Sequence, residues 1–246
     1  MLLQRGFVLV EFGIDWERVR ASLGPEAAPP EDAHEETAEE TVGSWLLAAP
    51  RPGIVGQGYF TLIAGNAVIV SEVLDWLETL PQVDSSRIAI AGSSTQGFVA
   101  LEALAREPRL AAAVVRVACG DYHRFLRSSS LGLGDDPRWL PDGELRLDPD
   151  YEAELREREP IHHPERFPPR PLLLLVGNVD HAIPFACARR TADAFRPAYD
   201  AGGVPERFQM IVFDGQGHHL GPAADALTLH WWERWLLSTD PQGDGG

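Results

Sequence analysis

The sequence predicts an α/β protein, built on a mostly parallel sheet with helices on both faces. Short apolar runs alternate with segments of helical periodicity along most of the chain. In the middle of this pattern, the apolar run 88–91 leads through a turn of small and polar residues into a run of good helix formers. Such alternation implies right-handed crossovers between parallel strands, so the carboxyl ends of the strands should meet at one edge of the sheet.

About five strands are expected in this sheet. They are Gly6–Phe12, Ile88–Ala91, Ala112–Val117, Leu172–Val176 and Phe208–Phe213. Helices are expected at Trp16–Leu23, Asn66–Leu80, Phe98–Ala105, Tyr151–Glu159, Phe185–Ala201 and Pro222–Leu237. The acidic stretch 25–40 and the Pro/Gly stretch 50–58 are both predicted to be loops.

The length of 246 residues suits one large domain with an insertion. Residues 1–120 and 172–238 are expected to form its two halves. Residues 121–171 are too long for a bare loop and are predicted to form a cap or lid. Residues 239–246 are expected to be a disordered tail.

Composition narrows the classes of function. A formal net charge of −16 argues against binding to nucleic acid or to an anionic membrane. The first residues are too short and too interrupted for a signal peptide or membrane helix, so we expect a soluble cytoplasmic protein. The two cysteines, Cys119 and Cys187, form no CxxC motif and are expected to be buried and reduced. No cofactor is expected. The adjacent His162 and His163 could suggest a metal site, but adjacent side chains point to opposite sides of the chain, so a solvated turn is favoured and no metal is expected.

The turn after the run 88–91 has the context of a nucleophile elbow, which is strand, sharp turn and helix. Gly92 and Ser94 fit the pattern Gly-x-Ser-x-Gly, but Gln96 stands at the second glycine position and Gly97 comes one residue later. A helix that begins here would aim the Thr95 N–H at charge developing near the serine oxygen. A plain small-residue turn in a parallel sheet is the alternative.

Ser94, Asp180 and His218 each come just after the carboxyl end of a predicted strand. A serine hydroxyl is a weak nucleophile and needs an adjacent base, and that base needs a group to orient it. Because parallel strands end at one edge of a sheet, a serine, a histidine and a carboxylate at these three positions are expected to lie near one another.

Three stretches resemble the motif regions of α/β-hydrolases, in the branch that includes dienelactone hydrolases, acetyl esterases and prolyl-oligopeptidase-type catalytic domains. They are VDSSRIAIAGSSTQG, PLLLLVGNVDHAIP, and FDGQGHHLG followed by WWERWL; RGFVLVEF resembles an early strand of that fold. The resemblance covers nearly the whole chain except the cap. It implies the chain order Ser, Asp, His, with Ser94 as nucleophile, Asp180 as acid and His218 as base. It also implies the Thr95 N–H as an oxyanion donor, and acyl transfer to water through an acyl-enzyme.

Each triad residue has a rival. Ser93 precedes Ser94, His219 follows His218, and Asp214 lies beyond the strand that leads to His218. Asp180 could also serve only as a helix N-cap.

Four further residues are expected to contact substrate, namely Gln96, Asp121, Tyr122 and Trp139. Each has a plainer alternative. Gln96 could simply cover the start of its helix, Asp121 and Tyr122 could be ordinary loop residues, and Trp139 could pack inside the cap.

The resemblance also implies strands ahead of Gly6, and an oxyanion loop among them, for which this chain has no counterpart. We expect a sequence that is truncated at its N-terminus and so lacks these strands; the alternative is a first strand shifted against the central one. The favoured function is cleavage of a small carboxylic ester. A peptidase of the prolyl-oligopeptidase type and a non-catalytic ligand-binding protein are the alternatives, and a homodimer is left open.

Overall fold

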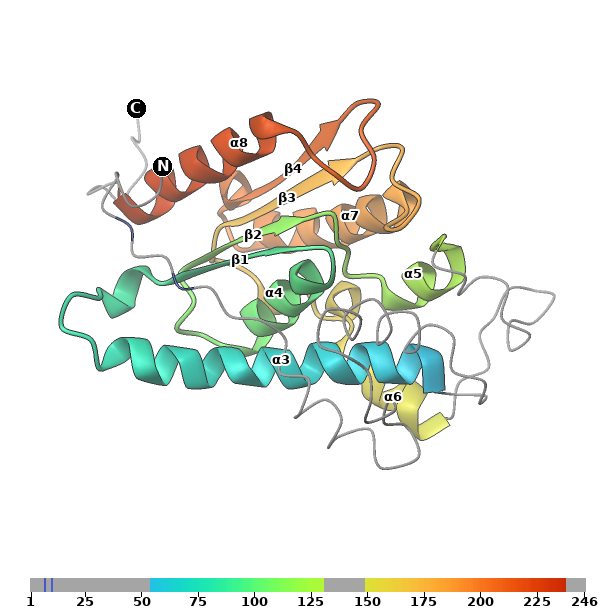
Figure 1. Cartoon of the computed structure of the whole chain (residues 1–246), viewed down its shortest axis with the longest axis horizontal. Coiled ribbons are helices and arrows are strands. Elements are labelled where there is room, and N and C mark those ends of the chain that lie inside the picture. The colour runs from blue at the N-terminus through green and yellow to red at the C-terminus, as the bar shows by residue number, and fades with distance from the viewer. Residues whose placement is uncertain (1–6, 8–9, 11–53, 131–148, 238–246) are drawn as a thin grey trace, which may run out of the picture.

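The computed structural model describes residues 7, 10, 54–130 and 149–237. Within these residues, four strands form one parallel sheet in the order β1-β2-β3-β4 (Figure 1). The strands are β1 (Ala89–Ser93), β2 (Ala112–Arg116), β3 (Leu172–Gly177) and β4 (Phe208–Phe213). The helices are α3 (Ile54–Glu78), α4 (Thr95–Arg106), α5 (Tyr122–Ser128), α6 (Pro149–Arg158), α7 (Phe185–Ala201) and α8 (Pro222–Trp232). Five shorter segments are η2 (Ser85–Arg87), η3 (Pro160–His162), η4 (Pro164–Arg166), η5 (Pro205–Arg207) and the π-helix η6 (Glu233–Leu237). This arrangement confirms the predicted α/β class.

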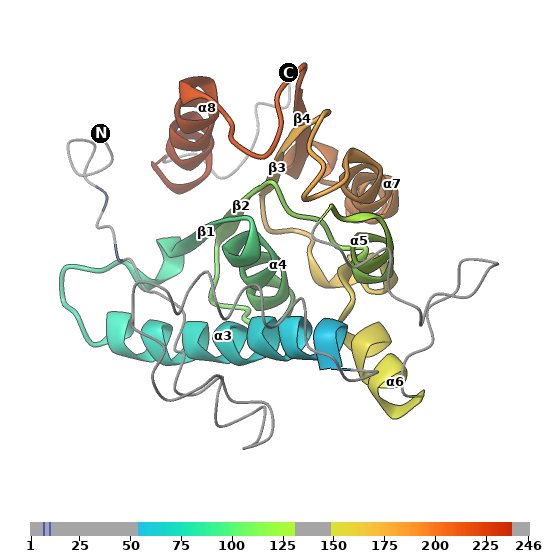
Figure 2. The same cartoon turned by 45° about the vertical axis from the view of Figure 1, so that its right-hand side comes forward.

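The sheet is covered by helices on both faces (Figures 1 and 2). Along β3, Leu172 and Leu174 pack into the core beneath α3, α4 and α7, whereas Leu173 and Leu175 pack into the core beneath α8. Since successive side chains of a strand point to opposite faces, a strand covered on both sides must be apolar throughout. This explains why β2 and β3 appear in the sequence as continuous apolar runs.

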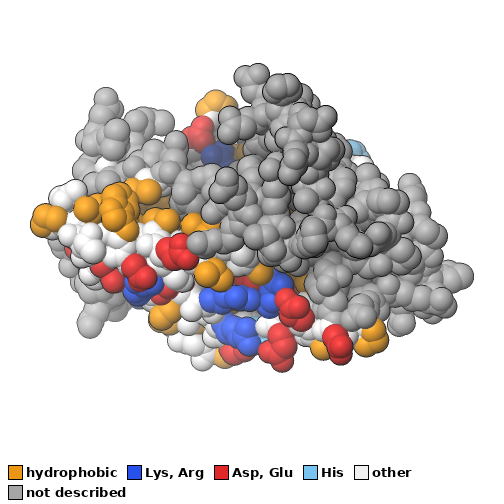
Figure 3. Space-filling model, turned by 60° about the horizontal axis from the view of Figure 1, so that its bottom comes forward, with side chains coloured by type: hydrophobic (Ala, Val, Ile, Leu, Met, Phe, Trp, Pro, Cys, Tyr) orange, Lys and Arg blue, Asp and Glu red, His pale blue; other side chains and the backbone are white. Residues whose placement is uncertain are grey.

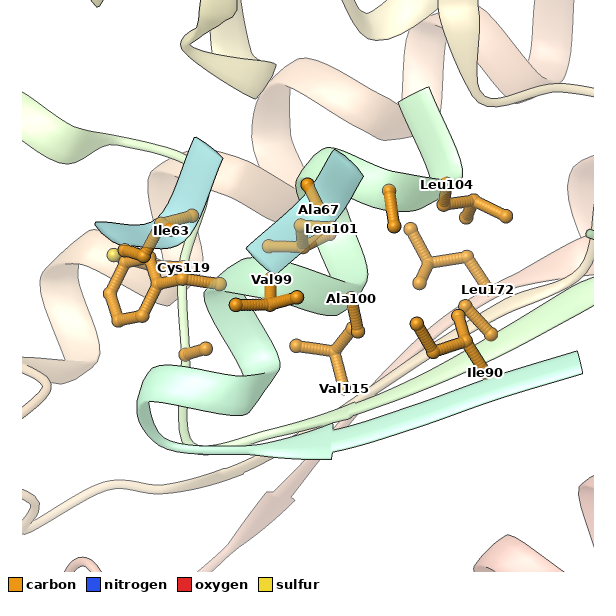
Figure 4. Packing of buried hydrophobic residues seen from close by; sticks show 14 of the residues in the cluster. Ile63, Ala67, Ile90, Val99, Ala100, Leu101, Leu104, Val115, Cys119 and Leu172 are labelled. Carbon is orange, nitrogen blue, oxygen red and sulfur yellow. The ribbon is translucent and has the colours of Figure 1, made fainter. Parts of the chain in front are cut away.

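Helix α4 lies directly against the sheet (Figure 4). Its Val99, Ala100 and Leu104 are fully or almost fully buried in the same cluster as Ile90 and Leu172 of the strands. Burying one such aliphatic side chain contributes about 1.5–3 kcal/mol. The helix that follows Ser94 therefore has a fixed position relative to β1 and β2.

Helix α3 begins at Ile54, inside the stretch 50–58 that was predicted to be a loop. That prediction was wrong because tertiary burial outweighs local propensity here. Phe60, Leu62 and Ile63 are almost fully buried, which offsets the cost of about 1 kcal/mol for each glycine in a helix interior.

The predicted cap region, 121–171, contains α5, α6, η3 and η4 in its described part. Arg158, at the end of α6, forms a buried ion pair with Glu102 of α4, with 2.9 Å between Nε and Oε1. Exposed pairs such as Arg156–Glu152 also occur. Figure 3, which turns the lower side of Figure 1 toward the viewer, shows acidic and basic side chains next to one another on that side of the molecule. The cap boundaries remain a prediction.

Two further expectations concern residues beyond the described ranges. The predicted strand 6–12 and helix 16–23 lie outside them, apart from Phe7 and Val10, which pack against the two cores. Among the helices that the structure describes, none combines the length and the apolar character that a bilayer-spanning segment requires.

The expectation of two reduced cysteines was wrong. Cys119, just beyond β2, and Cys187, in the first turn of α7, are joined by a buried disulfide. They are 68 residues apart in the chain, so their spacing gave no signal of pairing. The disulfide ties the carboxyl end of β2 to the helix that follows the Asp180 loop.

Candidate active site

Ser94 occupies the sharp turn between β1 and α4. Its backbone has φ 55° and ψ −124°, a conformation that is rare for a residue with a side chain and that is kept where surrounding structure enforces it. A Cβ on Gly92 would lie 2.0 Å from the backbone oxygen of Gln96, so only glycine fits there. The turn therefore has the geometry of a nucleophile elbow.

The displaced second glycine has a structural explanation. A Cβ on Gly97 would lie 2.7 Å from Cβ of Ala118 and 3.0 Å from the backbone oxygen of Arg116. Gly97 thus provides the close approach of α4 to the end of β2. Gln96 lies in the first turn of α4 and is half-buried.

His218 lies between Ser94 and Asp180. Its Nε2 is 2.9 Å from Oγ of Ser94, and its Nδ1 is 2.9 Å from Oδ2 of Asp180. A carboxylate can only accept, so Nδ1 donates to Asp180 and Nε2 is left to accept the Ser94 hydroxyl proton. The three predicted residues, which lie far apart in the chain, are brought together in the relay that a base-activated serine requires.

Asp180 is almost completely buried, and both of its oxygens are engaged. Oδ1 accepts the backbone N–H groups of Ala182 and Ile183, each at 2.9 Å, while Oδ2 faces His218. The helix N-cap role considered from the sequence is not what the structure shows, because Pro184 is the N-cap of α7 and Oδ1 of Asp180 caps only the turn 181–184 ahead of that helix. The other oxygen remains for His218. These bonds fix the direction in which the carboxylate points.

The loops that carry Asp180 and His218 are held to each other directly. Asn178 Nδ2 donates to Oδ1 of Asp214 at 2.7 Å, and the N–H of Gly215 donates to Oδ1 of Asn178 at 2.8 Å. Val179 N–H also donates to the backbone oxygen of Gln216 at 3.1 Å. Asp214, the rival acid, thus pairs with Asn178 and belongs to the support of the site.

The other rivals lie beside the triad. Ser93 is the last residue of β1, paired in register with Arg116, while Ser94 makes the contact with His218. His219 is exposed, and its ring centroid is 5.8 Å from that of His218.

Thr95, the expected oxyanion donor, is the first residue of α4. The first N–H groups of a helix lack intrahelical partners and carry the positive end of the helix dipole. The Thr95 side chain also has a partner that the sequence did not reveal. Its Oγ1 lies 3.2 Å from the hydroxyl of Tyr59 in α3.

The four residues that were expected to contact substrate have different positions in the structure. Gln96 stays a prediction, beside Ser94 and half-buried, and Trp139 lies outside the described residues. Asp121 is 2% exposed, accepts from the Arg124 N–H as the N-cap of α5, and pairs with Arg190.

Tyr122 is fully buried and stacked on Phe60, with ring centroids 4.2 Å apart. Together with the engagement of the Asp121 carboxylate, this placement does not support a substrate-contact role for either residue. The reason is that α5, which the sequence did not predict, turns both side chains into the protein.

Two of the three histidines of the cap region lie against one buried carboxylate. Nδ1 of His123 and Nε2 of His162 lie 2.8 and 3.1 Å from Oε2 of Glu159, which is 0% exposed. Burial is the largest single effect and would lower the pKa of His123, but the hydrogen bond that its Nδ1 donates to Glu159 and the charge of that carboxylate together raise the pKa above its usual value. Among the described residues, no group of three or more His, Cys, Asp or Glu side chains is arranged so that it could hold a metal ion.

Comparison with known proteins shows which proteins this chain is similar to. Residues 70–239 match the model of the prolyl oligopeptidase family. Among curated proteins, the one named "Putative esterase YitV", from Bacillus subtilis, is 28% identical over 159 residues. The match covers 63% of this chain and 59% of that relative, so the chain spans about three fifths of its length.

Solved structures give the same fold. TT1662 from Thermus thermophilus is 26% identical with a TM-score of 0.55, over 78% of this chain and 70% of that one. A puromycin-hydrolyzing peptidase from Mycobacterium tuberculosis is 22% identical with a TM-score of 0.56, over 72% of this chain and 26% of that one. These matches confirm the resemblance inferred from the sequence.

Proposed function

The chain belongs to the prolyl oligopeptidase family, and from that membership we propose that it is a serine hydrolase that cleaves small carboxylic esters, with Ser94 as nucleophile. The observation that carries the proposal is the continuous contact from Oγ of Ser94 through His218 to Asp180, 2.9 Å at each step. Two short contacts to one imidazole, at a strained serine, are what base-assisted nucleophilic attack needs.

The chemistry follows from these positions. His218 Nε2 takes the hydroxyl proton as Oγ of Ser94 attacks the ester carbonyl, and Asp180 stabilises the imidazolium that forms. The carbonyl oxygen becomes an oxyanion, which the Thr95 N–H stabilises. The loss of one such donor typically costs about a hundredfold to a thousandfold in kcat.

The tetrahedral intermediate then collapses. The carbon–oxygen bond to the alcohol breaks, and His218 gives its proton to the departing oxygen. Water, deprotonated by His218, attacks the acyl-enzyme in the same way, and release of the acid restores Ser94 and its proton. The cycle needs no group beyond the protein and water.

An ester substrate is favoured by the similarity to the Bacillus subtilis protein, whose name describes an esterase. Peptide cleavage is the second candidate. It is favoured by the family match itself and by the likeness to the puromycin-hydrolyzing peptidase, which at 22% identity supports the fold rather than the substrate. A non-catalytic ligand-binding protein is disfavoured by the short contacts on both sides of His218.

The test compares an activated acetyl ester with a proline-containing peptide anilide on the purified chain, on Ser94→Ala and on Ser93→Ala. We expect ester hydrolysis that Ser94→Ala reduces to background and that Ser93→Ala leaves near the starting rate. Cleavage of the anilide alone would identify a peptidase. A folded chain with neither activity would contradict the proposed function.

A further inference from the structure

Tyr59 connects helix α3 to the turn that carries the nucleophile. Its hydroxyl lies 3.2 Å from Oγ1 of Thr95, the residue that follows Ser94. Helix α3 lies alongside α4 in both views of the molecule (Figures 1 and 2). Neither the proposed chemistry nor the family match assigns this tyrosine a role.

The ring of Tyr59 is held in one place by other aromatic rings. It meets Phe98 of α4 edge to face with centroids 5.9 Å apart, and it lies 5.5 Å from Phe125 of α5. Only 7% of the residue is exposed. Because aromatic packing and burial fix the ring, the hydroxyl has a defined position beside Thr95.

The phenol is also neutral under all ordinary conditions. Burial raises the pKa of Tyr59 above its usual value, and the hydrogen bond with Thr95 only partly opposes this effect. A neutral phenol can both donate and accept, so the contact with the Thr95 hydroxyl persists across the pH range in which a histidine base works.

The first turn of α4 lacks the usual support at its start. Ser94 occupies the N-cap position, but its side chain makes no capping hydrogen bond, since its oxygen faces His218. A missing cap costs a helix about 1 kcal/mol. In place of a capping hydrogen bond, the contact between Thr95 and Tyr59 holds this turn to a neighbouring helix, α3.

We propose that Tyr59 is a positioning residue of this site, which acts through Thr95 to orient the first N–H groups of α4 toward the oxyanion. This inference rests on the proposed function, because it assigns Tyr59 to the reaction in which Ser94 is the nucleophile. Orientation of a donor matters most in the transition state, where the charge on the oxygen is largest.

The test uses Tyr59→Phe, Thr95→Val and the double variant, with the activated acetyl ester as substrate. Tyr59→Phe keeps the ring and removes only the hydroxyl. We expect kcat to fall about tenfold in each single variant, with KM nearly unchanged. An arylboronic acid mimics the tetrahedral intermediate, and its affinity for each variant should fall in parallel with kcat. The double variant should be no slower than the slower single variant, because both changes remove one contact.

Tyr199→Phe is the matched control. Tyr199 is also a buried tyrosine, but its hydroxyl donates to the backbone oxygen of Arg170 at 2.6 Å and makes no contact with the triad. We expect this variant to change the melting temperature without changing kcat. Thr95→Ser, which restores a hydroxyl, should recover most of the kcat that Thr95→Val loses.

Wild-type kcat in Tyr59→Phe would overturn the inference and leave the proposed function intact. Losses that multiply in the double variant would also overturn it, because they would show that the two hydroxyls act independently. Failure of the proposed function gives a different result, which is a wild-type chain that neither hydrolyses the ester nor reacts with a fluorophosphonate.

Discussion

Gly177 is the position at which a single methyl group should separate the acid from the base. It is the last residue of β3, and a Cβ there would lie 2.2 Å from the backbone oxygen of Gln216 and 2.4 Å from that of Gly217. His218 follows immediately. Since both atoms belong to backbone rather than to a flexible side chain, Gly177→Ala must move the His218 loop.

The size of the effect follows from the contact distance. Close carbon–oxygen contacts in proteins are about 3.3 Å, so the loop must withdraw by about 1 Å. A shift of that size breaks the 2.9 Å contacts of His218 and corresponds to a loss of about a hundredfold in kcat. The strain should also reduce the free energy of unfolding by about 1–3 kcal/mol.

The assay measures kcat for the activated ester and the melting temperature of each variant by circular dichroism. Gly65→Ala is the control, because nothing lies within 4 Å of a Cβ at that position in α3. It should keep full activity and gain about 1 kcal/mol of stability from the helix propensity of alanine. A folded Gly177→Ala variant with wild-type kcat would refute the reasoning.

Three further predictions concern single interactions. Glu107→Gln should destabilise the protein by about 1–2 kcal/mol at pH 7, because Arg109 lowers the pKa of Glu107 to about 2. Measured by urea unfolding, the difference in free energy of unfolding between wild type and variant should shrink as pH falls below about 4.5 and vanish near pH 2. A difference that stays constant with pH would contradict this prediction. Replacing Cys119 and Cys187 together by alanine should cost about 4 kcal/mol from loop entropy, and a reductant should then have no further effect on unfolding. Asn178→Ala should lower kcat several-fold. It should change the free energy of unfolding by less than about 1.5 kcal/mol, because the two side-chain hydrogen bonds of Asn178, at 2.7 and 2.8 Å, are exposed to solvent. An unchanged kcat would show that other contacts hold the Asp180 and His218 loops together.

The sequence predicted what depends on local pattern. The runs that became β2 and β3 are apolar throughout because helices cover both faces, and β4 and α7 match their predicted bounds. The site could be predicted because parallel strands end at one edge, so residues just beyond three strand ends had to meet. The positions of Ser94, Asp180 and His218 followed from that rule and from the resemblance.

What the sequence did not reveal depends on contacts between distant segments. Tyr59 lies 36 residues before Thr95, directly after the stretch 50–58 whose prolines and glycines indicated a loop. The partnership of Asn178 with Asp214 depends on the register of β3 against β4, which no local pattern encodes. Asp121 shows the converse error, because a residue beyond a strand end became a helix cap turned toward the interior.

The central claim is that Ser94 is activated by His218. Fluorophosphonate labelling of the purified chain, followed by mass spectrometry of the modified peptide, tests it most directly, since the probe reacts with a serine whose proton an adjacent base can take. We predict modification at Ser94 that is lost in His218→Ala and retained in Ser93→Ala. A folded chain that is not labelled at Ser94, or that is labelled equally in His218→Ala, would contradict the account.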